Sequence, residues 1–450
     1  MKSTFLHATL AFGLAAIPAS GQSTRPAVED FKPASTNQVG KDYPQVNSEG
    51  RVRARIAAPQ AREVFLVVNG IKFPMIKDAN GVWTGDSTPF DEGNHYYNLL
   101  VDSASVPDPG STYIFGSGMW QNDIEIPAKD QDFYSLKNVP HGQVREVLYF
   151  GKTSNAMRHA FIYTPPDYDK DPAKRYPVLY LQHGYREGES GWSGQGHAGL
   201  IIDNLLAEGK CKPFIIVMEN GGISNGRGGR PNLPPGSPAN GAPHGEPIAI
   251  ERLPAAQAAT VPATATAPAT ASAPATAPTP FAGRGGRGGM GPMVGMGGDF
   301  EQILLKDVIP YVDANFRTIA DQPHRALAGL SMGGMQTRQI GLAHLDTFAY
   351  VGVFSGGSIA PADVKDMDAF KQKVKLVFVS YGSREVDPAA RRARPGGGGG
   401  GALGGDPKAN TDALQAAGVN TRYYVSPQTA HEWQSWRRSL HEFAPLVFKD

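Results

Sequence analysis

The sequence of 450 residues contains one cysteine, Cys211, so no internal disulfide bond can form. The Cys211 thiol is either a reactive group or a packing residue near the end of a helix, and we favour packing. Net charge is also almost absent, because 43 basic residues stand against 42 acidic ones. This balance argues against nucleic acid or an anionic membrane as the main partner. There is no H-E-x-x-H motif, since His431-Glu432 lacks the second histidine, so we expect no metal and no cofactor.

The sequence lacks any apolar run of the roughly 20 residues that a membrane-spanning helix needs. A shorter apolar run at residues 10–17 follows Lys2 and precedes the small residues 19–21. This order of charge, apolar centre and small residues is typical of a secretory signal peptide. We therefore expect residues 1–21 to be a signal peptide and the protein to be secreted or periplasmic.

Glycine and proline, 54 and 37 residues respectively, are concentrated in two stretches. Residues 253–283 carry no charge and consist largely of Ala, Thr and Pro, and residues 395–405 are mostly glycine. Such segments cannot bury enough apolar surface to offset the entropy of ordering the chain. We interpret them as low-complexity insertions, near 225–297 and 390–405, within a globular protein.

Residues 22–40 are polar and are expected to be a flexible leader, and residues 41–130 predict a small β-sandwich. Residues 52–56 alternate apolar and charged side chains, as a half-buried strand does. Residues 64–68 form an apolar run that ends at Asn69-Gly70, a hairpin signal. Short strands with closely spaced turns favour a sandwich.

Part of this region resembles the immunoglobulin-like early-set module found beside starch and xylan enzymes. The resemblance rests on residues 81–84 (GVWT), 96–102 (YYNLLVD) and 107–110 (PDPG). It implies either a carbohydrate-binding module or a domain that only packs on its neighbour. Trp83, Tyr96 and Tyr97 are then candidates to stack on sugar rings, although core packing is expected for at least half of them.

Residues 131–450 predict an α/β fold. A helical pattern occupies residues 199–209. Apolar, β-prone runs lie at residues 161–163, 178–181, 214–218, 325–328 and 374–379. Mostly apolar strands separated by helices indicate a mainly parallel sheet that is covered on both faces.

Residues 329–334 (GLSMGG) fit the G-x-S-x-G pattern, after a predicted strand and before a predicted helix at 335–342. This context is that of a nucleophile elbow, with Ser331 as the nucleophile. The amide of Met332 would then face a developing oxyanion. The second donor should come from a loop after an early strand, and the Tyr185 amide is our candidate. We interpret His183 as a loop anchor rather than a second base.

A serine nucleophile needs a histidine base, and the base needs a carboxylate to orient it. His431 follows a strand-like run at residues 423–426 and precedes a predicted helix. Glu385 and Asp387 both follow the predicted strand at 374–379 and both qualify as the acid. The resulting chain order of serine, acid and histidine is that of α/β-hydrolases.

These motifs resemble carbohydrate esterase family 1, the group of esterase D and the feruloyl esterases, which is related to enterochelin esterases and mycolyltransferases. The resemblance runs from about residue 145 to 450, apart from the insertions. It is carried by residues 176–184 (YPVLYLQHG), Trp192, 203–210 (DNLLAEGK), 329–334 (GLSMGG) and 431–437 (HEWQSWR). It implies an α/β-hydrolase fold, favours Glu385 over Asp387, and makes Trp192 and Trp433 tentative substrate-binding residues.

The resemblance implies a secreted serine esterase that acts on feruloyl or acetyl esters of plant polysaccharide. Its partners would be an ester-decorated polysaccharide or a small ester, with no nucleic acid and no membrane. Three alternatives remain open: a siderophore esterase, a mycolyltransferase-like acyltransferase, and a polysaccharide-binding protein with an inactive hydrolase domain.

Overall fold

The structure is a computed structural model that describes residues 28–221, 298–387 and 405–449. The expected signal peptide at 1–21 lies outside these residues, as do the start of the leader, the insertion near 225–297 and all but the last residue of the one near 390–405. The expectation of a flexible leader is wrong for its described part, because residues 32–33 pair with residues 45–46 and Ala34 is buried in the core of the N-terminal part. In the part of the chain that is described, no helix has the length and apolar character needed to cross a membrane.

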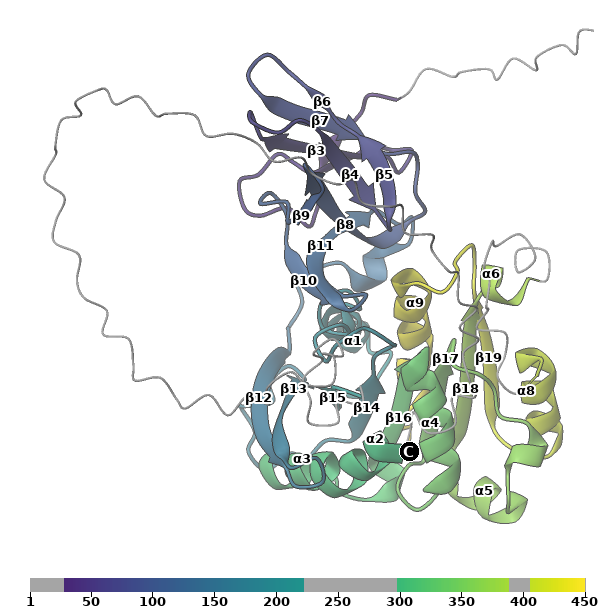
Figure 1. Ribbon diagram of the computed structural model, residues 1–450. Helices are drawn as coiled ribbons and strands as arrows, with labels where there is room; N and C mark the ends of the chain where they lie inside the picture. Colours follow the sequence, from purple (N-terminus) through teal and green to yellow (C-terminus); the bar gives the residue numbers. More distant parts are fainter. Residues whose placement is uncertain (1–27, 222–297, 388–404, 450) are drawn as a thin grey trace, which may run out of the picture.

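The N-terminal part is a β-sandwich of two antiparallel sheets (Figure 1). The strands of the first sheet, in order, are β1 (Lys32–Pro33), β2 (Gln45–Val46), β3 (Val52–Ala57), β7 (Val82–Asp86) and β6 (Ile76–Lys77). The second sheet has the order β10 (Tyr113–Gly116), β11 (Met119–Ile126), β8 (Gly93–Val101), β4 (Val64–Val68) and β5 (Ile71–Pro74), and β9 (Ala104–Val106) pairs with β8. Alternate side chains of β8 are buried, as the period of two in a strand requires.

The C-terminal part is built on one sheet of eight strands. In order, the strands are β12 (Gln143–Gly151), β13 (Ala156–Thr164), β15 (Ile215–Glu219), β14 (Val178–Gln182), β16 (Arg325–Leu330), β17 (Tyr350–Phe354), β18 (Leu376–Gly382) and β19 (Thr421–Ser426). All neighbours from β15 to β19 are parallel, whereas β13 runs antiparallel to both of its neighbours. The expectation of a mainly parallel sheet is therefore confirmed.

Helices cover both faces of this sheet. One face packs on α1 (Ala198–Ala207) and α9 (Trp433–Phe443). The other face packs on the continuous helical stretch α2 (Gly298–Ile303), η2 (Leu304–Val308) and α3 (Ile309–Asn315), and on α4 (Met332–Ala343), α5 (Met367–Lys373) and α8 (Pro407–Ala416). The remaining short helices are η1 (Gln131–Tyr134), η3 (Gln322–His324), η4 (Pro361–Asp363), α6 (Ser383–Val386) and η5 (Ala444–Leu446). Neighbouring residues of β14, such as Val178 and Leu179, point into opposite cores, which explains their continuous apolar run.

Two boundaries differ from the sequence-based expectation in ways that affect the site. Helix α4 begins at Met332, directly after Ser331, rather than at residue 335. Gly333 and Gly334 lower helix propensity, but the close packing described below overrides it. Strands β12 and β17 were not predicted from sequence, and β17 supplies part of the site. The Cys211 thiol packs against the core beside α1, and burial raises its pKa to about 12, which agrees with a packing role.

Candidate active site

Ser331 lies at the sharp turn between β16 and α4 with backbone angles φ 52° and ψ −114°. A residue other than glycine adopts such a φ only where the surrounding structure enforces it. The Ser331 amide donates to the carbonyl of Phe354 at 2.8 Å, which fixes the turn. A β-carbon on Gly333 would lie 2.6 Å from the carbonyl oxygen of His183, so only glycine fits there. The turn thus has the geometry of the predicted nucleophile elbow.

His431 joins the two other residues of the predicted set. Its Nε2 lies 2.8 Å from Oγ of Ser331, and its Nδ1 lies 2.7 Å from Oε1 of Glu385. With the ring proton on Nδ1, the imidazole donates to the carboxylate and accepts from the serine hydroxyl. These three residues are separated by 46 and 100 positions in the chain, and the fold brings them together at the carboxyl ends of β16, β18 and β19.

Glu385 is held by hydrogen bonds on both oxygens. Its Oε2 accepts from the Ser355 hydroxyl and from the Gly382 amide, both at 2.8 Å. The Ser355 hydroxyl in turn accepts from the indole N–H of Trp436 at 3.1 Å. Ser355 follows β17 directly, which is why sequence reasoning missed it. Asp387, the alternative acid, is exposed, and the carboxylate beside His431 is that of Glu385.

The loop after β14 borders the nucleophile. A β-carbon on Gly184 would lie 3.4 Å from the β-carbon of Ser331. Tyr185 is the next residue in this loop, and Met332 starts α4 on the other side of Ser331. His183 is buried, with Nδ1 2.8 Å from the Gly184 carbonyl and Nε2 accepting from the Gly221 amide at 3.1 Å. Burial lowers the pKa of His183, so a neutral ring anchors the loop, in agreement with its expected role.

The tentative substrate-binding tryptophans are buried. Trp192 is 1% exposed and Trp433 is 3% exposed, and their rings meet edge to face at 5.6 Å. The Trp192 indole donates to the carbonyl of Gln182 at 2.9 Å, and the Trp433 indole donates to the hydroxyl of Tyr96 at 2.9 Å. Because both N–H groups and both rings are engaged inside the protein, we correct this expectation: the two residues are part of the core beneath the site.

Tyr96, on β8 of the sandwich, links three parts of the site. Its hydroxyl donates to the carboxylate of Glu187 at 3.0 Å and accepts from Trp433 and from Gln195 Nε2 at 3.3 Å. Glu187 belongs to the loop that contains Tyr185. Burial is the main cause that raises the pKa of Glu187 to about 7. No sequence motif signals these contacts, because each joins residues more than 90 positions apart.

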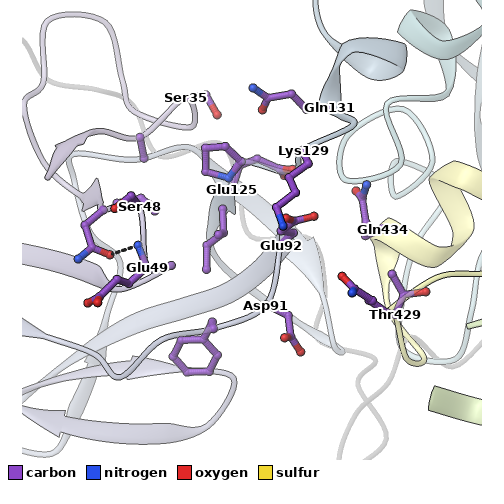
Figure 2. A pocket seen from close by; sticks show the side chains of 18 of the residues that line it. Ser35, Ser48, Glu49, Asp91, Glu92, Glu125, Lys129, Gln131, Thr429 and Gln434 are labelled. Carbon is purple, nitrogen blue, oxygen red and sulfur yellow. Dashed lines mark hydrogen bonds between the residues drawn. The ribbon is translucent and has the colours of Figure 1, made fainter. Parts of the chain in front are cut away.

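A polar cavity of about 710 Å³ lies between the sandwich and the loop that carries His431. Figure 2 shows Asp91 and Glu92 on the sandwich side, and Thr429 and Gln434 on the side of α9. Asp91 also forms an ion pair with Arg384, the residue before Glu385. The sandwich thus contacts the acid loop as well as the Tyr185 loop. Among the residues that the structure describes, no group of His, Cys, Asp or Glu side chains is arranged to hold a metal ion.

The family model for esterases matches residues 151–245 and 291–445 of the chain. The chain belongs to this esterase family. It is 36% identical over 438 residues to an endo-1,4-beta-xylanase/feruloyl esterase of Xylanibacter ruminicola. The match covers 96% of this chain and 49% of that relative, so the chain spans about half the length of the curated relative.

The chain is also similar to solved structures of esterases. The enterobactin esterase of Shigella flexneri aligns with a TM-score of 0.51 at 14% identity, over 88% of this chain and 92% of that one. A ferulic acid esterase of the anaerobic fungus Anaeromyces mucronatus aligns with a TM-score of 0.46 at 19% identity, over 71% of this chain and 96% of that one. The similarity to the Shigella flexneri enzyme is one of fold, and the present chain has the α/β-hydrolase fold.

Proposed function

We propose that the chain is a secreted serine esterase that releases feruloyl or acetyl groups from plant cell-wall polysaccharide through an acyl-enzyme. The observation that carries the proposal is the position of His431, 2.8 Å from the Ser331 hydroxyl and 2.7 Å from the Glu385 carboxylate. The name of the Xylanibacter ruminicola relative supports the substrate class. The signal-peptide pattern at residues 1–21 supports secretion.

In the first half-reaction, Oγ of Ser331 attacks the ester carbonyl while Nε2 of His431 takes the hydroxyl proton. The amides of Met332 and Tyr185 stabilise the negative charge on the carbonyl oxygen, and one such donor typically contributes about 10²–10³ in turnover. The tetrahedral intermediate collapses when His431 returns the proton to the leaving alkoxide of the sugar. The products of this step are the free sugar hydroxyl and an acyl ester of Ser331.

In the second half-reaction, water replaces the alkoxide. His431 takes a proton from the water as it attacks the acyl-enzyme, and then returns that proton to Oγ of Ser331. The carboxylic acid leaves, and the enzyme is regenerated. Throughout, Glu385 keeps the proton of the neutral imidazole on Nδ1 and stabilises the imidazolium that forms in each half-reaction.

We infer that the sandwich is an immunoglobulin-like early-set module. Its two antiparallel sheets and the segments that carry the resemblance support this assignment. The aromatic residues first considered for sugar binding do not support a sugar site at their positions. Trp83 and Tyr97 are buried, and Tyr96 is half-buried with its hydroxyl bonded to Glu187 and Trp433.

The proposal is tested by assaying wild type and Ser331→Ala on methyl ferulate, acetylated xylan, a triglyceride and a siderophore lactone. Wild type should hydrolyse methyl ferulate or acetylated xylan, and Ser331→Ala should lose roughly 10⁶-fold in kcat. Ser154→Ala is the matched control, because that hydroxyl donates to the Gly151 carbonyl in the β12–β13 turn. Product analysis in the presence of acceptor sugars separates hydrolysis from acyl transfer. Hydrolysis of the lactone alone, or full activity in Ser331→Ala, would overturn the proposal.

A further inference from the structure

The sandwich exposes a pair of large aromatic side chains on the β10–β11 hairpin. Trp120 is 58% exposed and Tyr113 is 48% exposed. Their rings stack with centroids 5.8 Å apart and planes 26° apart, and Phe115 packs with its ring edge-on to Trp120, also at 5.8 Å. Stacked aromatic rings left open to water are typical of a surface that binds a ligand. We call Tyr113, Phe115 and Trp120 the aromatic platform.

The hairpin register explains why these rings share one face. Phe115 lies directly opposite Trp120, and Tyr113 is two residues before Phe115. Since side chains alternate along a strand, all three project from the same side of the hairpin. The ring of Tyr96 packs against the other side of the hairpin at Gly116, where an added β-carbon would lie 2.5 Å from that ring.

The hairpin is attached to the loop that borders the nucleophile. The Gly118 amide donates to the Arg186 carbonyl at 2.6 Å, and the Ser117 amide donates to Oε1 of Glu187 at 3.2 Å. A β-carbon on Gly188 would lie 3.3 Å from the ring of Phe115. Arg186 is only two residues after Gly184, the residue beside Ser331, and two residues span at most about 7 Å. The aromatic platform therefore lies one short loop away from the reacting centre.

Two features make this surface ready to bind. The Gln195 side chain donates to the Phe115 carbonyl at 2.9 Å, and the Gln121 side chain donates to the Gly116 carbonyl at 2.8 Å, so the hairpin is held in place. Between Ser331 and the hairpin, Tyr185 exposes 60% of its surface. This exposed aromatic residue belongs to the loop that joins Gly184 to Arg186, the residue whose carbonyl accepts from the hairpin.

We propose that the aromatic platform binds sugar rings of the polysaccharide chain whose ester is bound at Ser331. This inference rests on the proposed function and names how the polymer is held. The acyl carbonyl must lie at Oγ of Ser331, so the acyl group occupies the space beside the triad. In this arrangement the alcohol side of the ester, which continues into the polymer, extends toward the aromatic platform beyond residues 184–188. A flat, uncharged aromatic face fits the apolar C–H face of a neutral sugar ring.

The test compares Trp120→Ala and Tyr113→Ala with Phe150→Ala, which removes an exposed aromatic ring from β12. Each variant is assayed on methyl ferulate and on feruloylated xylan. We expect kcat/KM on the polymer to fall about tenfold through KM in each platform variant, with methyl ferulate unaffected. Phe150→Ala should match wild type on both. Trp120→Phe, which keeps a flat ring, should recover most of the loss.

A second measurement keeps the inference separate from the catalytic proposal. Calorimetry of Ser331→Ala with ester-free xylo-oligosaccharide should show binding that the added Trp120→Ala change abolishes. Failure of wild type on every ester would overturn the proposed function and leave this measurement intact. Three outcomes for the platform variants would overturn the proposed sugar binding: an equal loss of kcat/KM on both esters, an unchanged kcat/KM on the polymer, or a change in oligomeric state in place of lost binding.

Discussion

Arg437 on α9 and Glu125 on β11 form a two-point ion pair, at 2.7 Å between Nη1 and Oε1 and at 3.0 Å between Nη2 and Oε2. Arg437 is completely buried, and it lies six residues after His431. The guanidinium also donates from Nε to the Gln195 carbonyl at 2.7 Å. The helix that follows the proposed base is thus fixed to the β-sandwich by a buried charge pair.

Glu125→Ala should destabilise the protein strongly, because it leaves a buried guanidinium without its counter-charge. The expected loss is about 3–5 kcal/mol in the free energy of unfolding, measured by denaturant titration. Asp412→Ala is the control, since the Lys408–Asp412 pair on α8 is exposed and should contribute at most about 0.5 kcal/mol. Similar losses in the free energy of unfolding of the two variants would contradict the expectation that burial makes the Arg437–Glu125 pair the more important one.

Glu385→Gln should lower kcat by roughly 10⁴ while leaving the fold intact, because the amide no longer stabilises the imidazolium of His431. Asp387→Asn should keep activity close to wild type, since Asp387 is exposed and lies beyond the contact with His431. Steady-state kinetics on methyl ferulate measures both variants. The reverse ranking would transfer the role of the acid to Asp387.

Ser355→Ala removes one of the two hydrogen bonds to Oε2 of Glu385 and the acceptor of the Trp436 indole. We expect kcat to fall about tenfold with little change in KM, because a hydrogen bond to a charged group contributes about 1.5–3 kcal/mol. Ser87→Ala, which removes a buried serine hydroxyl from the sandwich, serves as the control. It should lose stability without losing kcat, and an equal effect on kcat would reduce Ser355 to a structural role.

Glu187 should make stability depend on pH. Its pKa is raised from 4.5 to about 7 in the folded protein, mainly by burial. The folded state therefore favours the protonated carboxyl, and this contribution is complete below the unfolded pKa and lost as pH rises through about 7. Glu187→Gln should remove the effect. Melting temperatures between about pH 5 and pH 8 should show wild type declining relative to the variant, and parallel curves would contradict the raised pKa.

The elbow and the order of the three site residues could be predicted from the sequence because they depend on local chemistry. A β-carbon on Gly329 would lie 2.6 Å from the backbone of Gly333 within the same turn, and His431 and Glu385 follow strands whose ends meet at one edge of a parallel sheet. The choice between Glu385 and Asp387 could not be made from these patterns. Both carboxylates follow the same strand, and only the direction of each side chain decides which one contacts His431.

Contacts between the sandwich and the α/β part could not be predicted. Tyr96 and Trp433 lie 337 positions apart, and neither belongs to a motif that implies the other. An aromatic side chain has the same pattern in sequence whether it faces a ligand or the core. This ambiguity explains why the sequence favours Trp192 and Trp433 as substrate-binding residues and does not single out Tyr113 and Trp120.

The sandwich meets the Tyr185 loop through Tyr96, the acid loop through Asp91, and the helix after His431 through Glu125. A shortened chain that begins at residue 131 would keep every residue of the proposed triad and would still lose all three contacts. We therefore expect a chain cut at this boundary to leave the buried guanidinium of Arg437 without its counter-charge.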